Sequence, residues 1–303
     1  FGIIDVTPIS FTLKIFNNLN LEFDSVKLIK PAPVSGPVNG IKTVGPPPSD
    51  FVSLTQAIDY LRTKGNGVNG ELYLELQPGY SCSNETFPLT INAIPGASAT
   101  NTITIRPASG ASAILVTSNH PGSTIILNNV KYLRIDGRPG GTGNPQMTLG
   151  NQNAAGNTIR FIHDASDNVI RHCTIQGVNN TTTSGAAPGV VFFGTTSVTT
   201  GSDNNLFEYC LLKNGASVPV YLVYSKGTSG KDNSSNTFSA NEFCNFSSSA
   251  IYLSSTGNGN NWLISGNSFY YNFGSPPSAS QTVIRFGSTT AAGNLITGNF
   301  IGG

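Results

Sequence analysis

The sequence has few charged residues, and this scarcity excludes several classes of protein. Of its 303 residues, 10% are Asp, Glu, Lys or Arg, against about 25% in ordinary domains. The net charge is +1 and no basic patch is present, so nucleic acid and anionic membranes are poor candidate partners. No apolar run approaches the ~20 residues of a membrane-spanning helix. Because 38% of the residues are hydrophobic and recur periodically, the composition does not fit a disordered chain either.

Cysteine pairs and catalytic motifs are also lacking. The four cysteines, Cys82, Cys173, Cys210 and Cys244, include no CxxC pair, which makes a zinc site unexpected. No Ser/His/Asp spacing, phosphate loop or metal motif is found in the sequence. We therefore predict no catalytic residue, no cofactor and no metal ion from motifs.

One pattern occurs five times after residue 156. It consists of an apolar strand with one aromatic residue, a polar turn, and a second strand of the form Asn-apolar-apolar-x-x-Cys/Asn-x-apolar. The first strands begin at Ile159, Val190, Val220, Ile251 and Ile284, and the second strands at Asn168, Asn205, Asn236, Asn261 and Asn294. A period of about 30 residues made of short strands indicates a solenoid. With period-2 alternation and no helix inside the repeat, it predicts a parallel β-helix.

The repeat also predicts which side chains stack on each other in neighbouring coils. Cys173 and Cys210 occupy the same repeat position, so we expect buried thiols on neighbouring coils, with a disulfide as the alternative. The repeated Asn has a structural explanation, because Asn tolerates the left-handed conformation at sharp turns and stacked Asn side chains form amide ladders.

The N-terminal part has a different organisation. Residues 1–30 contain two alternating runs that predict a β-hairpin, and we interpret them as the end of a preceding β-sandwich domain. Residues 31–50 are rich in Pro and predict an extended linker. A capping-box pattern at Ser53 and the apolar spacing after it predict a helix over residues 53–64, which covers the first coil of a β-helix spanning residues 51–303. The chain ends within the repeat, so we expect a C-terminally truncated piece of a longer, processed polypeptide.

An ordered set of segments resembles a known group of proteins. The set comprises DFVSLTQAI from Asp50, QPGY from Gln77, IPGASATNTITI from Ile94, IDGRPGGTG from Ile135 and NTIRFIHDAS from Asn157. Together these segments resemble the right-handed parallel β-helix regions of large secreted and cell-surface proteins of Bacteroidota, many of them cargo of the type IX secretion system. The resemblance implies an extracellular location and export by outer-membrane secretion machinery. It implies no single activity.

One row of side chains is a candidate glycan site. By repeat position, the outward row of the first strands is expected to contain Ile126, Arg160, Val191, Tyr221, Tyr252 and Arg285. Aromatic faces flanked by Arg stack on sugar rings and bond their hydroxyls or carboxylates. We therefore predict glycan binding by Arg160, Tyr221, Tyr252 and Arg285. The competing explanation is the ordinary preference of Tyr and Val for exposed sheet faces.

Two polar clusters are candidates for catalysis, and a structural explanation is favoured for each. His163, Asp164 and Asp167 share one turn, where Asp more often caps the backbone. Asp136, with Arg134 and Arg138, lies beside Gly137, which is typical of a turn.

We interpret the chain as a non-enzymatic extracellular β-helix module that serves as a stalk or adhesin and binds cell-surface glycans or other polysaccharides. The alternative is a polysaccharide lyase or glycoside hydrolase on a β-helix, which needs acidic residues aligned on neighbouring coils. A third possibility is cargo held by secretion machinery.

Overall fold

The computed structural model of the chain divides into two compact units, Phe1–Gly36 and Pro37–Gly303. The residues that it describes are 2–6, 10–16, 19, 22–29, 36–62, 66–182, 186–194, 198–274, 279–287 and 291–302. Residues 31–35, the first part of the predicted linker, lie outside this set.

The first unit is a three-stranded antiparallel sheet. Its strands are β1 (Gly2–Val6), β2 (Ser10–Phe16) and β3 (Glu22–Ile29), in the order β1-β2-β3. The β2–β3 pair, with Ser10 opposite Ile29, is the hairpin expected from the alternating runs. Strand β1 was not anticipated.

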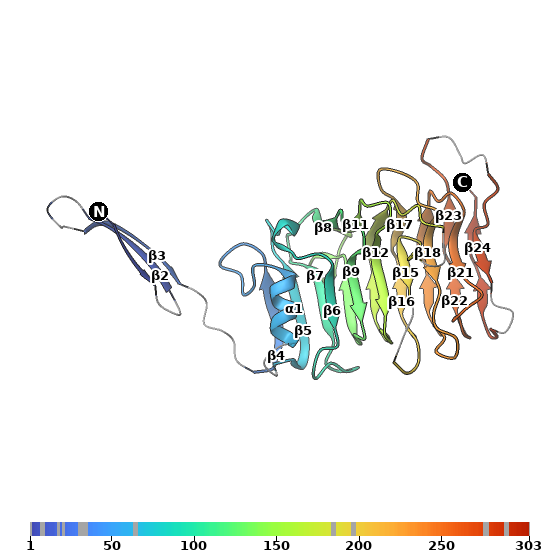
Figure 1. The fold of residues 1–303 in the computed structure, drawn as a ribbon, viewed down its shortest axis with the longest axis horizontal. Coiled ribbons are helices and arrows are strands. Elements are labelled where there is room, and N and C mark those ends of the chain that lie inside the picture. Colours follow the sequence, from blue (N-terminus) through green and yellow to red (C-terminus); the bar gives the residue numbers. More distant parts are fainter. Residues whose placement is uncertain are drawn as a thin grey trace. The chain divides into compact units, whose positions relative to one another are not determined.

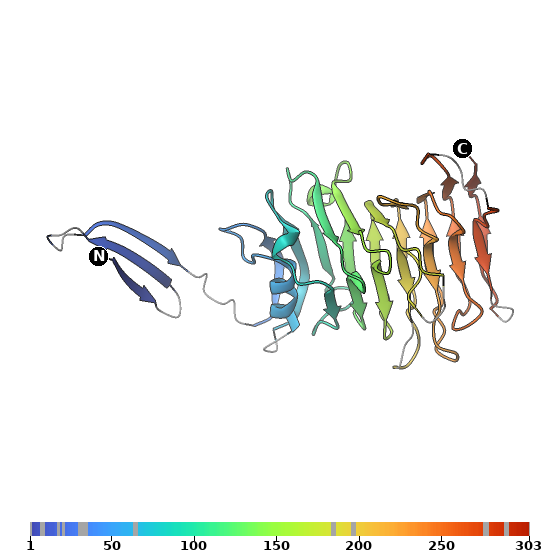
Figure 2. The same cartoon turned by 45° about the horizontal axis from the view of Figure 1, so that its top comes forward.

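The second unit is a right-handed parallel β-solenoid of about 8 turns with about 32 residues per turn, as Figures 1 and 2 show. This confirms the predicted fold class. Each complete coil passes through three sheets, which we call sheets I, II and III. Sheet I contains β4 (Val38–Val44), β5 (Val68–Leu76), β7 (Ile103–Pro107), β10 (Leu133–Asp136), β13 (Val169–Arg171), β16 (Leu206–Glu208), β19 (Thr237–Ser239), β22 (Leu263–Ser265) and β25 (Leu295–Thr297). Sheet II contains β8 (Ile114–Ser118), β11 (Met147–Asn151), β14 (Cys173–Gly177), β17 (Leu211–Asn214), β20 (Glu242–Cys244), β23 (Ser268–Tyr270) and β26 (Phe300–Ile301). Sheet III contains β6 (Leu89–Asn92), β9 (Ser123–Asn128), β12 (Asn157–Ile162), β15 (Val191–Phe193), β18 (Tyr221–Ser225), β21 (Ser249–Leu253) and β24 (Ile284–Phe286).

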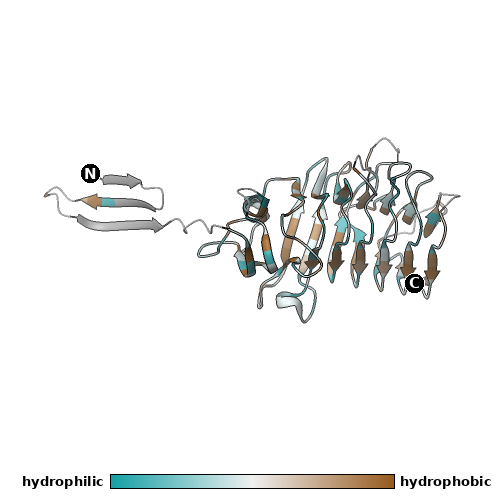
Figure 3. Cartoon of the chain, turned by 90° about the horizontal axis from the view of Figure 1, so that it is seen from below, coloured by the Kyte–Doolittle hydropathy of each residue, from teal (hydrophilic) through white to brown (hydrophobic). Residues whose placement is uncertain are grey.

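Apolar side chains from all three sheets fill the interior. Figure 3 shows the hydrophobic strands stacked coil on coil, with hydrophilic connections between them. Aromatic rings continue this stacking: Phe161 and Phe193 lie 4.4 Å apart between ring centroids at an interplanar angle of 6°. Phe243 and Phe269 repeat the arrangement at 4.9 Å and 12°. Since coils repeat at about 4.8 Å, a ring above a ring fills the core without gaps.

The register of sheet III differs from the sequence expectation. Ile159 pairs with Val191, and Val191 pairs with Val223, so the strands predicted to begin at Val190 and Val220 are displaced by one and three residues. The cause is a bulge, at which two consecutive residues of each strand point inward. The amides of Thr158 and Ile159 both donate to the carbonyl of Val190, at 2.8 and 3.2 Å. The consecutive pairs that are fully buried are Val190 and Val191, Leu222 and Val223, and Ala250 and Ile251.

The repeated Asn residues form a ladder at the entrance to sheet I. Nδ2 of Asn168 donates to Oδ1 of Asn205 at 3.0 Å, and Nδ2 of Asn205 donates to Oδ1 of Asn236 at 3.0 Å. All three side chains are fully buried. The amide ladder is therefore confirmed. The left-handed conformation belongs instead to the preceding residue of each coil, with φ of 59° at Asp167, 56° at Asn204 and 56° at Ser235.

The repeat pattern predicts that Asn261 belongs to the ladder, but the structure places it one position earlier. It is exposed and has φ of 62°, which makes it the left-handed residue of its coil. Trp262 takes the ladder position, and its indole Nε1 donates to the carbonyl of Asn233 at 2.8 Å. The fully buried indole thus keeps a hydrogen-bond partner where the Asn side chain is missing.

A second ladder lies at the start of the strands of sheet II from β14 onward. It consists of Cys173, Cys210, Asn241, Asn267 and Asn299. The prediction of buried thiols on neighbouring coils is confirmed: Cys173 and Cys210 are both free and buried. Their Sγ atoms lie 3.2 Å from the carbonyl of Arg171 and 3.4 Å from that of Glu208. Burial raises the pKa of Cys210 to about 12, so the thiol stays protonated at neutral pH.

One helix covers the N-terminal end of the solenoid (Figure 1). Helix α1 (Leu54–Arg62) buries Leu54, Ala57, Ile58 and Leu61 in the common core. Ser53 caps it, since its Oγ accepts from the amide of Gln56 at 3.1 Å. In a regular capping box, the side chain of Gln56 would accept from the amide of Ser53. Here its Oε1 accepts from the amide of Val52 instead.

Two features near the cap were not predicted. The carboxylate of Glu85 accepts from the amides of Leu54 and Thr55, both at 2.7 Å, which neutralises the positive end of the helix. Strand β4 occupies residues predicted as linker: it pairs in parallel with β5 and forms the outer strand of sheet I. The linker prediction therefore does not hold for residues 38–44.

The two Asn classes predict different mutational effects. Asn205→Ala removes four side-chain hydrogen bonds from a fully buried site, so we expect the free energy of unfolding to fall by on the order of 3 kcal/mol. Asn261→Gly, the matched control, removes an exposed side chain at a positive φ that Gly adopts freely, and should change stability by less than about 0.5 kcal/mol. Urea denaturation followed by circular dichroism measures both. Equal losses in the two variants would contradict the assignment of Asn261.

Candidate functional site

The outward row of sheet III contains three of the four predicted glycan-binding residues. The register aligns Thr90, Ile126, Arg160, Phe192, Tyr224, Tyr252 and Arg285. Tyr221 is outside the row and pairs with Ser249, while Val191 is buried in the core and not outward. The bulge explains the error at Val191, because it shifts the alternation of that strand by one residue. The error at Tyr221 arises because the pair Val220-Tyr221 recurs three residues later as Val223-Tyr224, and the second pair is the one in register. The alignment contains no carboxylate, as expected.

The row forms one continuous set of ring contacts, which we call the aromatic row: Phe192, Tyr224 and Tyr252, with Tyr221 beside them. The ring centroids of Phe192 and Tyr224 are 6.1 Å apart, and those of Tyr224 and Tyr252 are 5.0 Å apart at 82°. The Tyr221 ring lies 5.2 Å from that of Tyr224 and 5.6 Å from that of Tyr252. Tyr221 therefore belongs to the cluster, although it does not share the row.

An arginine lies at each end of the aromatic row. Cζ of Arg160 is 5.5 Å from the centroid of Phe192, and Cζ of Arg285 is 4.4 Å from that of Tyr252. Such cation–π contacts contribute about 0.5–1 kcal/mol at exposed sites. Neither arginine forms an ion pair with any residue in the described ranges. Burial lowers the pKa of Arg160, and its Nε is enclosed without a hydrogen-bond partner among those residues.

Most of the aromatic row is covered. Phe192 and Tyr224 are each 4% exposed and Tyr221 is 7% exposed. Ala187 and Val220 pack against them. Tyr252 and Arg160 are partly buried, the Nε of Arg160 being enclosed, and Arg285 is exposed. The most accessible part of the predicted site is therefore its end at β21 and β24.

The turn cluster of His163, Asp164 and Asp167 has structural partners throughout. Nδ1 of His163 lies 2.8 Å from Oδ1 of Asn128. Oδ2 of the buried Asp164 accepts from the amide and the hydroxyl of Thr199, both at 2.7 Å. The three residues have φ of 53°, 64° and 59°. Their geometry is that of a backbone turn stabilised by Asp, which was the favoured interpretation.

Asp136 belongs to a strip of alternating charge on the outer face of sheet I, which we call the charge strip. Its members are Glu75, Arg106, Asp136, Arg171 and Glu208, one from each of five successive coils. Arg106 Nη2 lies 2.7 Å from Glu75 Oε1, and Arg171 Nε lies 2.9 Å from Asp136 Oδ2. Stacked like charges would repel each other, so alternation allows five ionised side chains to share one row.

Within the charge strip, Asp136 is the most enclosed residue, at 1% side-chain exposure. Arg138 donates to both of its oxygens, with Nε–Oδ1 at 3.0 Å and Nη2–Oδ2 at 2.9 Å. Burial alone would raise the pKa of Asp136, but the hydrogen bonds from Arg138 and the charge of Arg171 outweigh it and lower that pKa. Arg134, grouped with Asp136 by sequence, lies in the neighbouring row opposite Val169.

Sequence reasoning missed a groove at the corner between sheets I and II. The rings of His172 and Tyr209 stack there with centroids 4.9 Å apart and an angle of 7°. The groove has a volume of about 330 Å³ and also touches Thr174, Leu211 and Glu242. We call it the corner groove. The available signal was position: His172 and Tyr209 each precede the Cys of the repeat.

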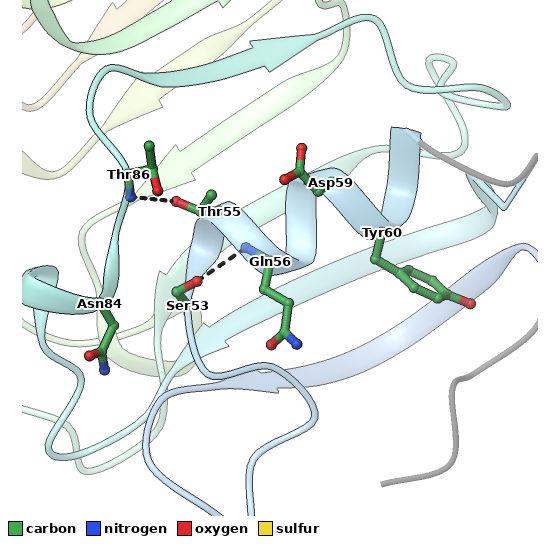
Figure 4. A pocket seen from close by; sticks show the side chains of 7 residues that line it. All are labelled: Ser53, Thr55, Gln56, Asp59, Tyr60, Asn84 and Thr86. Atoms are coloured by element: carbon green, nitrogen blue, oxygen red, sulfur yellow. Dashed lines mark hydrogen bonds between the residues drawn. The ribbon is translucent and has the colours of Figure 1, made fainter. Parts of the chain in front are cut away.

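A second cleft, of about 470 Å³, lies beside the capping helix (Figure 4). Its lining is mostly hydroxyl and amide groups, from Ser53, Thr55, Gln56, Asn84 and Thr86. The amide of Thr86 donates to the hydroxyl of Thr55 at 2.9 Å, so part of this lining holds the helix against the segment that follows η1 (Cys82–Asn84).

Among the described residues, no group of three or more His, Cys, Asp or Glu could hold a metal ion. None of the described helices has the length and hydrophobicity needed to cross a membrane.

The charge strip predicts how stability depends on pH. Because the pKa of Asp136 is depressed in the folded state, its contribution is present above the unfolded pKa of about 3.9 and is lost as the pH falls through the folded pKa. Asp136→Asn should lower the free energy of unfolding by about 3 kcal/mol at pH 7, and the difference from wild type should shrink below about pH 4. Urea denaturation at pH 7 and pH 3 measures this.

Glu208→Gln is the matched control. Glu208 is 25% exposed and lies 3.8 Å from Arg171 Nη1, so its loss should cost less than about 1 kcal/mol. A difference between wild type and Asp136→Asn that does not change with pH would refute the role given to the carboxylate.

Comparison of the chain with models of known protein families and with curated proteins finds no match. What the candidate sites can bind is therefore inferred from their residues and geometry alone.

Proposed function

We propose that this chain is an extracellular β-solenoid module that serves as a stalk or adhesin of a larger cell-surface or secreted protein, and that it binds glycans on sheet III. The observation that carries the glycan-binding proposal is the open end of the aromatic row. There the exposed Arg285 lies 4.4 Å over the ring of Tyr252, and neither residue faces a carboxylate in its row. The extracellular location and export as type IX cargo are supported only by the resemblance described above.

The chemistry of this end suits a sugar. Tyr252 provides an aromatic surface and a hydroxyl, and the Arg285 guanidinium provides several N–H donors for hydroxyl or carboxylate oxygens. Since the adjoining row positions are aromatic, no acidic side chain in the row competes for the guanidinium. An acidic polysaccharide gains a charge-assisted hydrogen bond there, and a neutral one gains only stacking and ordinary hydrogen bonds.

The scaffold supports the stalk part of the proposal. From β13 onward, successive coils are fixed to one another by parallel strand pairs in all three sheets and by buried Asn ladders. A buried amide that loses its ladder partner costs free energy, so bending or sliding of these coils over one another is opposed. Repeated coils of this kind form a rigid spacer.

The enzymatic alternative has less support. The aligned carboxylates lie in the charge strip, where Asp136 is 1% exposed and is bonded to two arginines. A glycosidase needs one carboxyl group that protonates the leaving oxygen and a second one open to water or substrate. The lowered pKa of Asp136 keeps it ionised and so unsuited to act as the acid.

Tyr252→Ala and Arg285→Ala should each reduce retention on polysaccharide arrays by about tenfold, because each removes a contact worth roughly 1 kcal/mol or more. Arg285→Ala should change the melting temperature little, because Arg285 is exposed, and Tyr252→Ala should lower it slightly, because the partly buried ring loses its contacts with Tyr221 and Tyr224. Arg62→Ala, a change at an exposed arginine on α1, is the matched control and should bind as wild type does. Unchanged retention in both site variants would end the proposal.

Tyr221→Ala distinguishes packing from ligand binding within the cluster. Because Tyr221 is 7% exposed while Tyr252 is only partly buried, its loss should lower the melting temperature more than Tyr252→Ala does. A double variant of Tyr221 and Tyr252 would mix the two effects, so the single variants are the informative ones.

A further inference from the structure

Every coil from β14 onward turns the corner between sheets I and II through one residue in the left-handed conformation. The φ values are 51° at His172, 53° at Tyr209, 53° at Ala240, 64° at Gly266 and 62° at Gly298. The register places these residues above one another, since each precedes an aligned strand of sheet II. We call this alignment the corner row. Its first two members have rings, and the next three have a methyl group or no side chain.

The stack of rings in the corner row stops where the corner groove lies. His172 covers one face of the Tyr209 ring at a centroid distance of 4.9 Å, which is the spacing of the coils. The other side of Tyr209 lies toward the coil of Ala240, whose methyl group is too small to cover it. Tyr209 accordingly remains 56% exposed. Such exposure is unfavourable for a large, mostly apolar ring, which would gain free energy from being covered. The corner groove therefore offers a ring-sized place next to an aromatic face.

The rest of the lining gives this place a chemical preference. Leu211 and Thr174 form a partly apolar floor, and Glu242 follows them in the same outward row of sheet II. The Glu242 side chain is exposed, and its Oε2 accepts from the hydroxyl of Tyr270 at 2.6 Å. Among the described residues no donor to its Oε1 is found. An aromatic face beside a free carboxylate oxygen matches a pyranose, whose C–H face stacks and whose hydroxyls donate.

We propose that the corner groove binds one neutral pyranose unit of a glycan, with its ring stacked on Tyr209 above Ala240 and a hydroxyl donating to Glu242. The ligand ring takes the place in the corner row that a side chain occupies in the two preceding coils. The charge of Glu242 disfavours uronic acids and sulfated sugars, so this preference is opposite to that of the Tyr252 and Arg285 end of sheet III. The two sites belong to different sheets, and neither proposal depends on the other.

The decisive variant fills the groove with the protein's own side chain. Ala240→Tyr extends the ring stack by one member, and the two preceding positions show that the corner conformation accepts an aromatic residue. The variant should fold with an unchanged or higher melting temperature and should lose binding. Tyr209→Ala should weaken binding by about tenfold through lost stacking, and Glu242→Gln should weaken it several-fold through a weaker acceptor.

Binding is measured by saturation-transfer NMR with the methyl pyranosides of glucose, galactose and mannose, and with sodium glucuronate. The spectra are recorded in a Tyr252→Ala, Arg285→Ala background, which removes the sheet III site, so that any transfer reports on the corner groove. In that background we expect transfer to at least one neutral pyranoside, less transfer to glucuronate, and none once Ala240→Tyr is added. Transfer that persists after Ala240→Tyr is added, or no transfer to any neutral pyranoside before it is added, would overturn the proposal.

Discussion

Parallel, in-register pairing of successive coils is the constraint on which this molecule depends. With coils about 4.8 Å apart, every side chain lies directly over its counterpart in the next coil, so each row must consist of residues that tolerate close stacking. Asn satisfies this by donating to and accepting from the next Asn, as Asn168 and Asn205 do at 3.0 Å. Phenyl rings satisfy it face to face, as Phe161 and Phe193 do. Charged residues satisfy it only by alternating in sign, which is the order found from Glu75 to Glu208.

The same constraint accounts for the low charge content of the chain. A row of one sign would accumulate repulsion at each coil, whereas Ser, Thr and Asn can be repeated without that cost. The charge strip is the exception, and there Asp136 is surrounded by guanidinium groups from Arg138 and Arg171. Where the strip stops, its row continues with Ser239, Ser265 and Thr297. Polar but neutral rows are thus the general solution, and the charged one needs a dedicated set of partners.

The fold could be predicted from the sequence because stacking repeats the chemistry at a regular interval. The period, the Asn ladder and the paired positions of Cys173 and Cys210 all follow from that repetition. The row of sheet III could not be assigned correctly, because its bulge places Val190 and Val191 both inward and breaks the alternation on which the assignment relied. Phe192 is therefore absent from the predicted row. Tyr224 is absent because the sequence repeats Val-Tyr at 220–221 and 223–224, and only the second pair is in register. Strand β4 was missed because Pro and Gly around it give the composition of a linker, while its pairing partner, β5, is 30 residues further along the chain.

Ladders also indicate where such a protein can bind anything. A complete row presents each ring or amide to its neighbour and leaves little for a ligand, which is why Phe192 and Tyr224 are only 4% exposed. A binding place arises where a row is interrupted, because the last ring is then not covered by a further ring. The aromatic row is interrupted at Tyr252, where the next residue, Arg285, is exposed and places its guanidinium over the ring. The corner row is interrupted at Tyr209, where the next residue is Ala240. Both candidate sites thus have the same physical origin, and their opposite charge preferences follow from the residue that happens to lie beside each interruption, Arg285 in one case and Glu242 in the other.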